Sequence, residues 1–132
     1  VLDFILDLKK EGIKTAIATS SNRPKFSHLK SKCPEFVALF DRILTAEDFS
    51  ASKPDPDCYL KAAAALGCTK DECAVFEDAF TGLQAGMASG MITVGLTTTN
   101  SREAIEGKCH FILDSWVGFT TDSLRKLLRS AL

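Results

Sequence analysis

The chain has 132 residues, 45% of them hydrophobic, which is enough for one domain built around a single core. Its 16 basic and 17 acidic residues nearly cancel, which argues against a nucleic-acid-binding or a polybasic membrane-binding surface. No apolar run approaches the roughly 18 residues of a membrane-spanning helix. Because the first residues carry acids and no basic leader, we expect no signal peptide.

The cysteines bear on the compartment. Five are scattered along the chain, and none forms a C-x-x-C pair. An odd number without metal-ligand spacing favours reduced, mostly buried thiols over a disulfide framework or a zinc site. We therefore expect a cytoplasmic protein.

Strand-like and helix-like patterns alternate along the chain. Short β-prone runs predict strands at 15–19, 42–45, 74–76, 91–96 and 110–113. Apolar residues at helical spacing predict helices at 1–10, 24–32, 57–66, 83–88, 102–106 and 122–132. A short apolar segment lies at 36–40, and a loop is expected at 46–56. This alternation predicts a single α/β domain, residues 1–132, with a mainly parallel sheet.

Two adjacent acids, Glu77 and Asp78, follow the apolar run at 74–76 directly. In an open α/β sheet, ligands bind at the carboxyl ends of the strands. Neighbouring carboxylates repel each other unless a cation or a proton lies between them, and their hard oxygens suit Mg²⁺. The alternative is a helix N-cap in which Asp78 or Thr81 satisfies free backbone donors.

Two further polar clusters follow predicted strands. Residues 19–23 (TSSNR) place hydroxyls and backbone donors at a helix start, which is typical of an anion site but also of an ordinary cap. Lys53 lies between short polar residues and two prolines, where it could neutralise a phosphate or simply be exposed. Phosphate donors, a cation and metal-binding acids together fit phosphoryl transfer. This set contains no nucleophile.

Three stretches, IKTAIATSSNR, SKPDPDCYLKAAAALG and AVFEDAFTGLQAGMASGM, carry a resemblance to a known family. The chain resembles the haloacid dehalogenase superfamily, and within it the β-phosphoglucomutase and phosphoglycolate phosphatase-like group. The resemblance implies a three-layer, Rossmann-like α/β core. It also implies a Mg²⁺-dependent phosphatase or phosphomutase that acts on a small phosphorylated metabolite, a sugar phosphate, through an aspartyl-phosphate.

The resemblance assigns roles to the three clusters. It makes Thr19 and Lys53 catalytic residues that bind the phosphoryl group, and Glu77 and Asp78 the ligands of Mg²⁺. The residues implied to bind the phosphorylated substrate are Thr19, Ser20, Ser21, Asn22, Arg23 and Lys53. It also makes Lys53-Pro54 a candidate cis peptide bond.

The sequence departs from the family pattern at its start. The family's first motif is an apolar strand ending in Asp-x-Asp, which supplies the nucleophile and the general acid and base. We find neither this motif nor the cap domain in the 132 residues. Asp114 ends a predicted strand but lacks a second aspartate at the required place, and the Asp55–Asp57 triplet lies in a loop. We therefore expect an incomplete core domain that is inactive by itself.

In the family's sheet the missing strand lies between the strands that carry Thr19 and Glu77. Its absence leaves unpaired backbone groups, each costing about 1–3 kcal/mol when buried. We expect the gap to be filled by the missing N-terminal segment, by a second copy of the chain, or by rearranged strand pairing.

Two other functions compete with the enzyme. A non-catalytic or split module of the same fold could bind a partner or a phosphorylated ligand. A receiver-type signalling domain also uses acids and a lysine around Mg²⁺, but in the reverse order along the chain.

Overall fold

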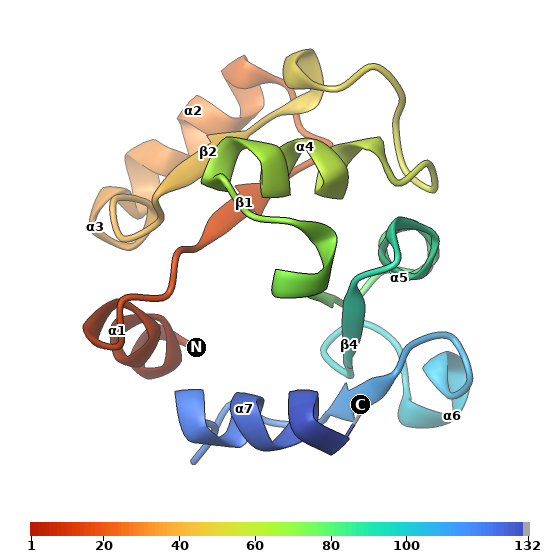
Figure 1. Cartoon of the computed structure of the whole chain (residues 1–132). Helices are drawn as coiled ribbons and strands as arrows, with labels where there is room; N and C mark the ends of the chain where they lie inside the picture. The colour runs from red at the N-terminus through yellow and green to blue at the C-terminus, as the bar shows by residue number, and fades with distance from the viewer. Residues whose placement is uncertain (131–132) are drawn as a thin grey trace.

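The computed structural model describes residues 1–130 and confirms the predicted α/β fold (Figure 1). The strands are β1 (Ala16–Ala18), β2 (Arg42–Leu44), β3 (Ala74–Glu77), β4 (Ile92–Leu96) and β5 (Phe111–Leu113). The α-helices are α1 (Leu2–Lys10), α2 (Arg23–Lys32), α3 (Pro34–Val37), α4 (Asp57–Leu66), α5 (Phe80–Ser89), α6 (Arg102–Ile105) and α7 (Thr121–Ser130). Two 3₁₀ turns, η1 (Ala46–Asp48) and η2 (Lys70–Glu72), lie in the connections. The last two residues of the predicted C-terminal helix, 131–132, lie outside the described residues.

All strand pairs are parallel, but they form two sheets. β1 pairs with β2, and β3, β4 and β5 pair in that order. Within residues 1–130, β1 and β3 each pair with a neighbour on one edge only. Both strands are largely half-buried, whereas the three central residues of β4 are buried. The expectation of rearranged pairing is wrong for the described residues, since β1 and β3 do not pair with each other.

Two hydrophobic clusters form the core, and the first of them bridges the two sheets. The cluster beneath α4 contains Cys58, Tyr59, Ala63, Val75, Ala85 and Met91, with Ala18 of β1 packed against it. The other joins α1 to α7 through Phe4, Ile5, Leu8 and Leu124. An aromatic group extends it, in which the ring of Phe4 lies 5.4 Å from that of Trp116 and 5.7 Å from that of Phe76. Because aromatic pairs add about 0.5–1.5 kcal/mol to burial, this group anchors β3 to the terminal helices.

Close packing between α5 and the sheet fixes the start of the helix near the strand ends. Gly86 faces Thr93 and Val75, and a Cβ atom at this position would lie 2.8 Å from the Thr93 hydroxyl oxygen. Only glycine allows the helix backbone to come this close to the strands. The first turn of α5 therefore lies directly after β3, where Glu77 and Asp78 stand.

The structure also bears on the expectations of no membrane-spanning helix and of reduced, mostly buried cysteines. None of the helices within residues 1–130 is long and apolar enough to cross a bilayer. All five cysteines are free thiols, but only Cys58 is fully buried and the other four are half-buried, so the expectation of mostly buried thiols is wrong.

Candidate active site

The turn after β1 holds the hydroxyl cluster of the sequence. Thr19 continues the β1–β2 ladder by donating its backbone amide to Leu44 at 3.0 Å, and its hydroxyl accepts the Ser21 amide at 3.1 Å. Asn22 caps α2, since its side chain accepts the amide of Lys25 at 2.9 Å. The side chains of Thr19 and Asn22 thus hold the turn after β1 in place through hydrogen bonds to its own backbone and to the start of α2.

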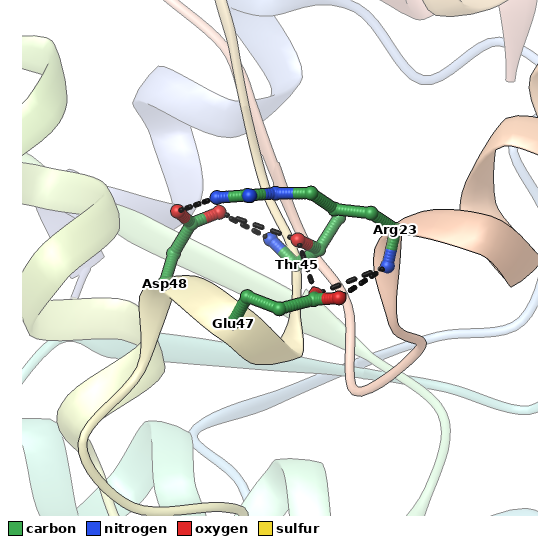
Figure 2. A network of polar contacts seen from close by, with 4 residues as sticks. All are labelled: Arg23, Thr45, Glu47 and Asp48. Atoms are coloured by element: carbon green, nitrogen blue, oxygen red, sulfur yellow. Dashed lines mark hydrogen bonds and ion pairs between the residues drawn. The ribbon is translucent and has the colours of Figure 1, made fainter.

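The first residue of α2 is bound to η1. The Arg23 amide donates to both carboxylate oxygens of Glu47, at 3.0 and 2.9 Å, and the Arg23 guanidinium lies 3.4 Å from Asp48 (Figure 2). Thr45 completes the network by donating its hydroxyl to Glu47. The Arg23 amide, the main cause, holds the pKa of Glu47 below its usual range. The carboxylates of Glu47 and Asp48 therefore already contact the Arg23 donors that the resemblance assigned to the substrate.

Ser20 and Lys53 lie on a common cavity. It has a volume of about 120 Å³ and is lined by Ser20, Ala46, Phe49, Ser50, Ala51, Ser52 and Lys53. The turn after β1 and the lysine loop, predicted separately from the sequence, thus meet at one place. Phosphate binding by residues 19–23 and Lys53 stays a prediction.

Lys53 is held in the interior by three neighbours. Its Nζ lies 3.1 Å from Glu77 Oε2 and 3.4 Å from the carbonyl oxygen of Ala18, so it links the carboxyl ends of β3 and β1. The amine also lies 5.2 Å from the centre of the Tyr59 ring, a cation–π contact. Only 13% of the Lys53 and Glu77 side chains is exposed, and the Lys53–Pro54 peptide is cis, as the resemblance implied. The alternative of a solvent-exposed loop lysine is therefore wrong.

Glu77 accepts four hydrogen bonds. Oε2 accepts from Lys53 and, at 2.7 Å, from the Tyr59 hydroxyl; Oε1 accepts the backbone amides of Asp78 and Ala79 at 3.0 and 3.1 Å. A carboxylate has about four lone-pair sites, so all of them are in use. Burial is the main cause that raises the pKa of Tyr59 far above its usual range, and the Glu77 carboxylate adds to it. Tyr59 therefore remains a hydrogen-bond donor.

Asp78 is held by the turn after β4. Its Oδ2 accepts from Thr99 at 2.5 Å and Thr98 at 3.2 Å, while the Asn100 amide donates to its backbone carbonyl at 3.1 Å. The Thr99 hydroxyl is the main cause that lowers the pKa of Asp78, against a smaller opposing effect of burial. Within residues 1–130, no hydrogen bond reaches Oδ1. This oxygen is therefore the carboxylate atom left for a cation.

The two acids fit Mg²⁺ as part of a site. Mg²⁺ commonly binds one or two protein carboxylates and completes its octahedron with waters and phosphate oxygens. Within the described part of the chain, no group of three or more His, Cys, Asp or Glu residues is arranged to hold a metal. The free oxygen of Asp78 fits such an ion directly, whereas Glu77 could bind it only by releasing one of its donors.

Other acids considered as nucleophile substitutes serve the structure instead. Asp114 pairs with Arg102 and accepts the Thr97 hydroxyl at the surface. Asp57 accepts the Ser50 amide, and Asp55 accepts the amide of Asp57 at 2.9 Å. Each is therefore engaged in a local turn or a surface ion pair.

Several residues of this site were not found from the sequence. Tyr59 lies on a helix pattern that indicates only packing, and Glu47 lies in a segment interpreted as a loop. Thr98, Thr99 and Asn100 follow the predicted strand at 91–96. Since the strand-end argument that selected Glu77 and Asp78 applies to them equally, they could have been predicted.

A comparison with protein families decides the family. The profile described as haloacid dehalogenase-like hydrolase matches residues 1–90, about two thirds of the chain. The chain belongs to this family. Among curated haloacid dehalogenase-like relatives, the β-phosphoglucomutase of Bacillus subtilis is 39% identical over 70% of this chain and 40% of its own length. The chloroplastic protein SUPPRESSOR OF QUENCHING 1 of Arabidopsis thaliana is 38% identical over 79% of this chain and 10% of its own length.

Solved structures of the family agree with the fold. A family IA, variant 3 hydrolase from Entamoeba histolytica superimposes with a TM-score of 0.86 at 26% identity, covering 95% of this chain and 57% of that one. The chain thus spans little more than half of this structure, and less than half of each of the two curated relatives. The resemblance drawn from the sequence is confirmed.

Proposed function

We propose that the chain is part of a Mg²⁺-dependent phosphatase or phosphomutase that acts on a small phosphorylated metabolite. The observation that carries the proposal is the Lys53–Glu77 ion pair beside Asp78, which gathers a cation and two acids at the carboxyl ends of β1 and β3. The family supports phosphatase or phosphomutase chemistry. The proposal includes a sugar phosphate as the substrate. It also includes a cytoplasmic location, which the five free thiols support.

Each residue has a role in this proposal. Thr19 and Ser20 donate hydrogen bonds to the phosphoryl oxygens, with Ser21, Asn22 and Arg23 around the substrate. Lys53 neutralises phosphoryl charge, and its contact with Glu77 fixes its position. Asp78 would hold Mg²⁺, together with Glu77 if it released a donor, and the ion would supply further charge neutralisation.

The nucleophile in this proposal comes from outside the 132 residues. Among residues 1–130, β1 and β3 each have one unpaired edge, and Lys53 links their carboxyl ends. We propose that a strand ending in acids lies between them, parallel to both. Its aspartate attacks the phosphorus atom, and an aspartyl-phosphate forms as the bond from phosphorus to the metabolite's oxygen breaks. That oxygen leaves with a proton from the general acid of the same strand. The strand would belong to a further segment of the same protein, since a second copy of the chain would bring only the same 132 residues.

The second candidate is a split or non-catalytic module of the same fold. The two open strand edges favour it, because an edge is a ready-made site for strand addition by a partner. The reading frame before Val1 separates the two candidates. An apolar strand ending in Asp-x-Asp supports the enzyme, whereas a translation start near Val1 supports the module.

The experiment uses a polypeptide that extends this chain at its N-terminus. Phosphate release from a panel of sugar phosphates is measured with and without Mg²⁺. We expect Mg²⁺-dependent turnover that Lys53→Met and Asp78→Asn abolish, while Asp122→Asn, which removes a surface ion pair with Arg125, retains it. Turnover that persists in both site variants, or that needs no Mg²⁺, would refute the proposal.

A further inference from the structure

The turn from Thr98 to Asn100 makes three hydrogen bonds with Asp78, and the proposed function gives this turn no role. We infer that this turn is a positioning device for the metal-binding carboxylate, with Thr98 and Thr99 as its positioning residues. The inference rests on the proposed function, since it assigns the turn to the Mg²⁺ ligand of that site.

Strand register brings the turn to Asp78. Glu77 is paired with Gly95 in the parallel β3–β4 ladder, so the chain leaves both strands at the same level. The turn after β4 therefore lies beside the turn after β3, although 20 residues separate Thr98 from Asp78. No insertion or bend is needed to bring the hydroxyls to the carboxylate.

The contacts restrain the side chain and the backbone of Asp78 together. The hydroxyls of Thr99 and Thr98 both donate to Oδ2, at 2.5 and 3.2 Å, and the Asn100 side-chain amide donates to the backbone carbonyl of Asp78 at 3.1 Å. With Oδ2 occupied, Oδ1 is the oxygen that remains for the cation. Hydrogen-bonded partners of a metal-ligating carboxylate fix its orientation, and their loss commonly weakens metal affinity 10–100-fold.

The turn is itself anchored at both ends, away from Asp78. Thr97 donates its hydroxyl to Asp114 at 3.1 Å, and Ser101 caps α6 by accepting the Ala104 amide at 3.2 Å. The turn is therefore fixed by the fold, and Asp78 is positioned by it.

Threonines that donate to different acids provide a matched experiment. We compare the unaltered chain with Thr98→Val/Thr99→Val, with Thr99→Ser, and with Thr69→Val as the control, because Thr69 donates its hydroxyl to Glu72 at 3.0 Å. Binding is followed with Mn²⁺ by paramagnetic broadening of backbone NMR signals around Asp78, and with Mg²⁺ by the shift in melting temperature. Circular dichroism without metal checks that each variant folds.

We expect the double variant to bind Mn²⁺ 10–100-fold more weakly. Thr69→Val, which loses a hydroxyl that donates to a different acid, retains the affinity, and so does Thr99→Ser, which keeps the donor. Unchanged affinity in the double variant overturns the inference and leaves the metal site intact. A double variant that fails to fold is replaced by Thr99→Val alone, under the same criteria. If the unaltered chain binds neither ion, the metal site of the proposed function fails and the inference falls with it.

Discussion

Glu77 joins parts of the chain that are distant in the sequence. Its carboxylate takes hydrogen bonds from the lysine loop, from α4 through Tyr59, and from the first amides after β3. A largely buried carboxylate with all its lone pairs satisfied is strongly oriented, and removal of any partner leaves a costly unpaired group. At the residue scale, this carboxylate determines where the lysine lies.

Tyr59 offers a direct test of this network because it is the one tyrosine of the chain. Free tyrosine ionises with a pKa of about 10. Burial, and then the Glu77 charge, raise the pKa of Tyr59 in the folded chain. As the pH rises, Tyr59 therefore loses its proton first in the unfolded chain. Its contribution to the free energy of unfolding is complete below about pH 10 and is lost as the pH rises further.

Tyrosinate absorbance against pH measures the effect. We expect Tyr59 to ionise only as the chain unfolds, and Glu77→Gln to lower its pKa while the fold persists. A folded chain whose tyrosine titrates near pH 10 would contradict the network.

Gly82 provides a second test at the same scale. A Cβ atom here would lie 2.1 Å from Glu77 Cδ, although alanine normally stabilises a helix by about 1 kcal/mol over glycine. We expect Gly82→Ala to lower the free energy of unfolding by about 1–3 kcal/mol, because it overpacks the carboxylate. In a Glu77→Ala background the same change becomes neutral or stabilising. Equal effects in both backgrounds, measured by chemical denaturation, would argue against the clash.

At the scale of elements, periodicity was sufficient for the long helices and every strand. It failed where the element is only about one turn long, because so short a segment shows no periodicity. η1 lies in a segment interpreted as a loop, and α3 lies in one interpreted only as apolar. α5 begins at Phe80, ahead of the predicted 83–88, although no side chain caps its start.

The site was predictable to the same extent. Strand ends located Thr19, Glu77 and Asp78, because the carboxyl ends of parallel strands meet at one edge of the sheet. The contact of Glu47 with Arg23 joins side chain to backbone across 24 residues, and no local pattern encodes it. The role of Tyr59 likewise depends on tertiary packing.

The link between η1 and α2 predicts a pH-dependent element. Hydrogen bonding lowers the pKa of Glu47, so its contribution is present above the unfolded value of about 4.3 and is lost as the pH falls. We expect the NMR shift of the Arg23 amide to follow this titration, and Glu47→Gln to abolish it. Glu72→Gln, which alters the capping box of η2 instead, is the control and leaves Arg23 unaffected. A titration of Arg23 that survives Glu47→Gln would refute the link.

At the scale of the whole molecule, the division into two sheets dominates. β1 and β3 are largely half-buried, and each has one unpaired edge within the described residues 1–130. Exposed edges of this kind promote association. We expect the isolated chain to self-associate or to unfold in a broad transition of low cooperativity. Size-exclusion chromatography with a denaturation curve measures both. A compact monomer with an ordinary cooperative transition would show that the gap needs no occupant.

The central claim is that these strand ends form a phosphoryl-transfer site whose nucleophile lies elsewhere. The most direct test is hydrolysis of p-nitrophenyl phosphate by the 132-residue chain in the presence of Mg²⁺. The account predicts negligible turnover, the same as that of Asp78→Ala. Turnover by the chain that disappears in Asp78→Ala would contradict the account, because the nucleophile would then lie within this sequence.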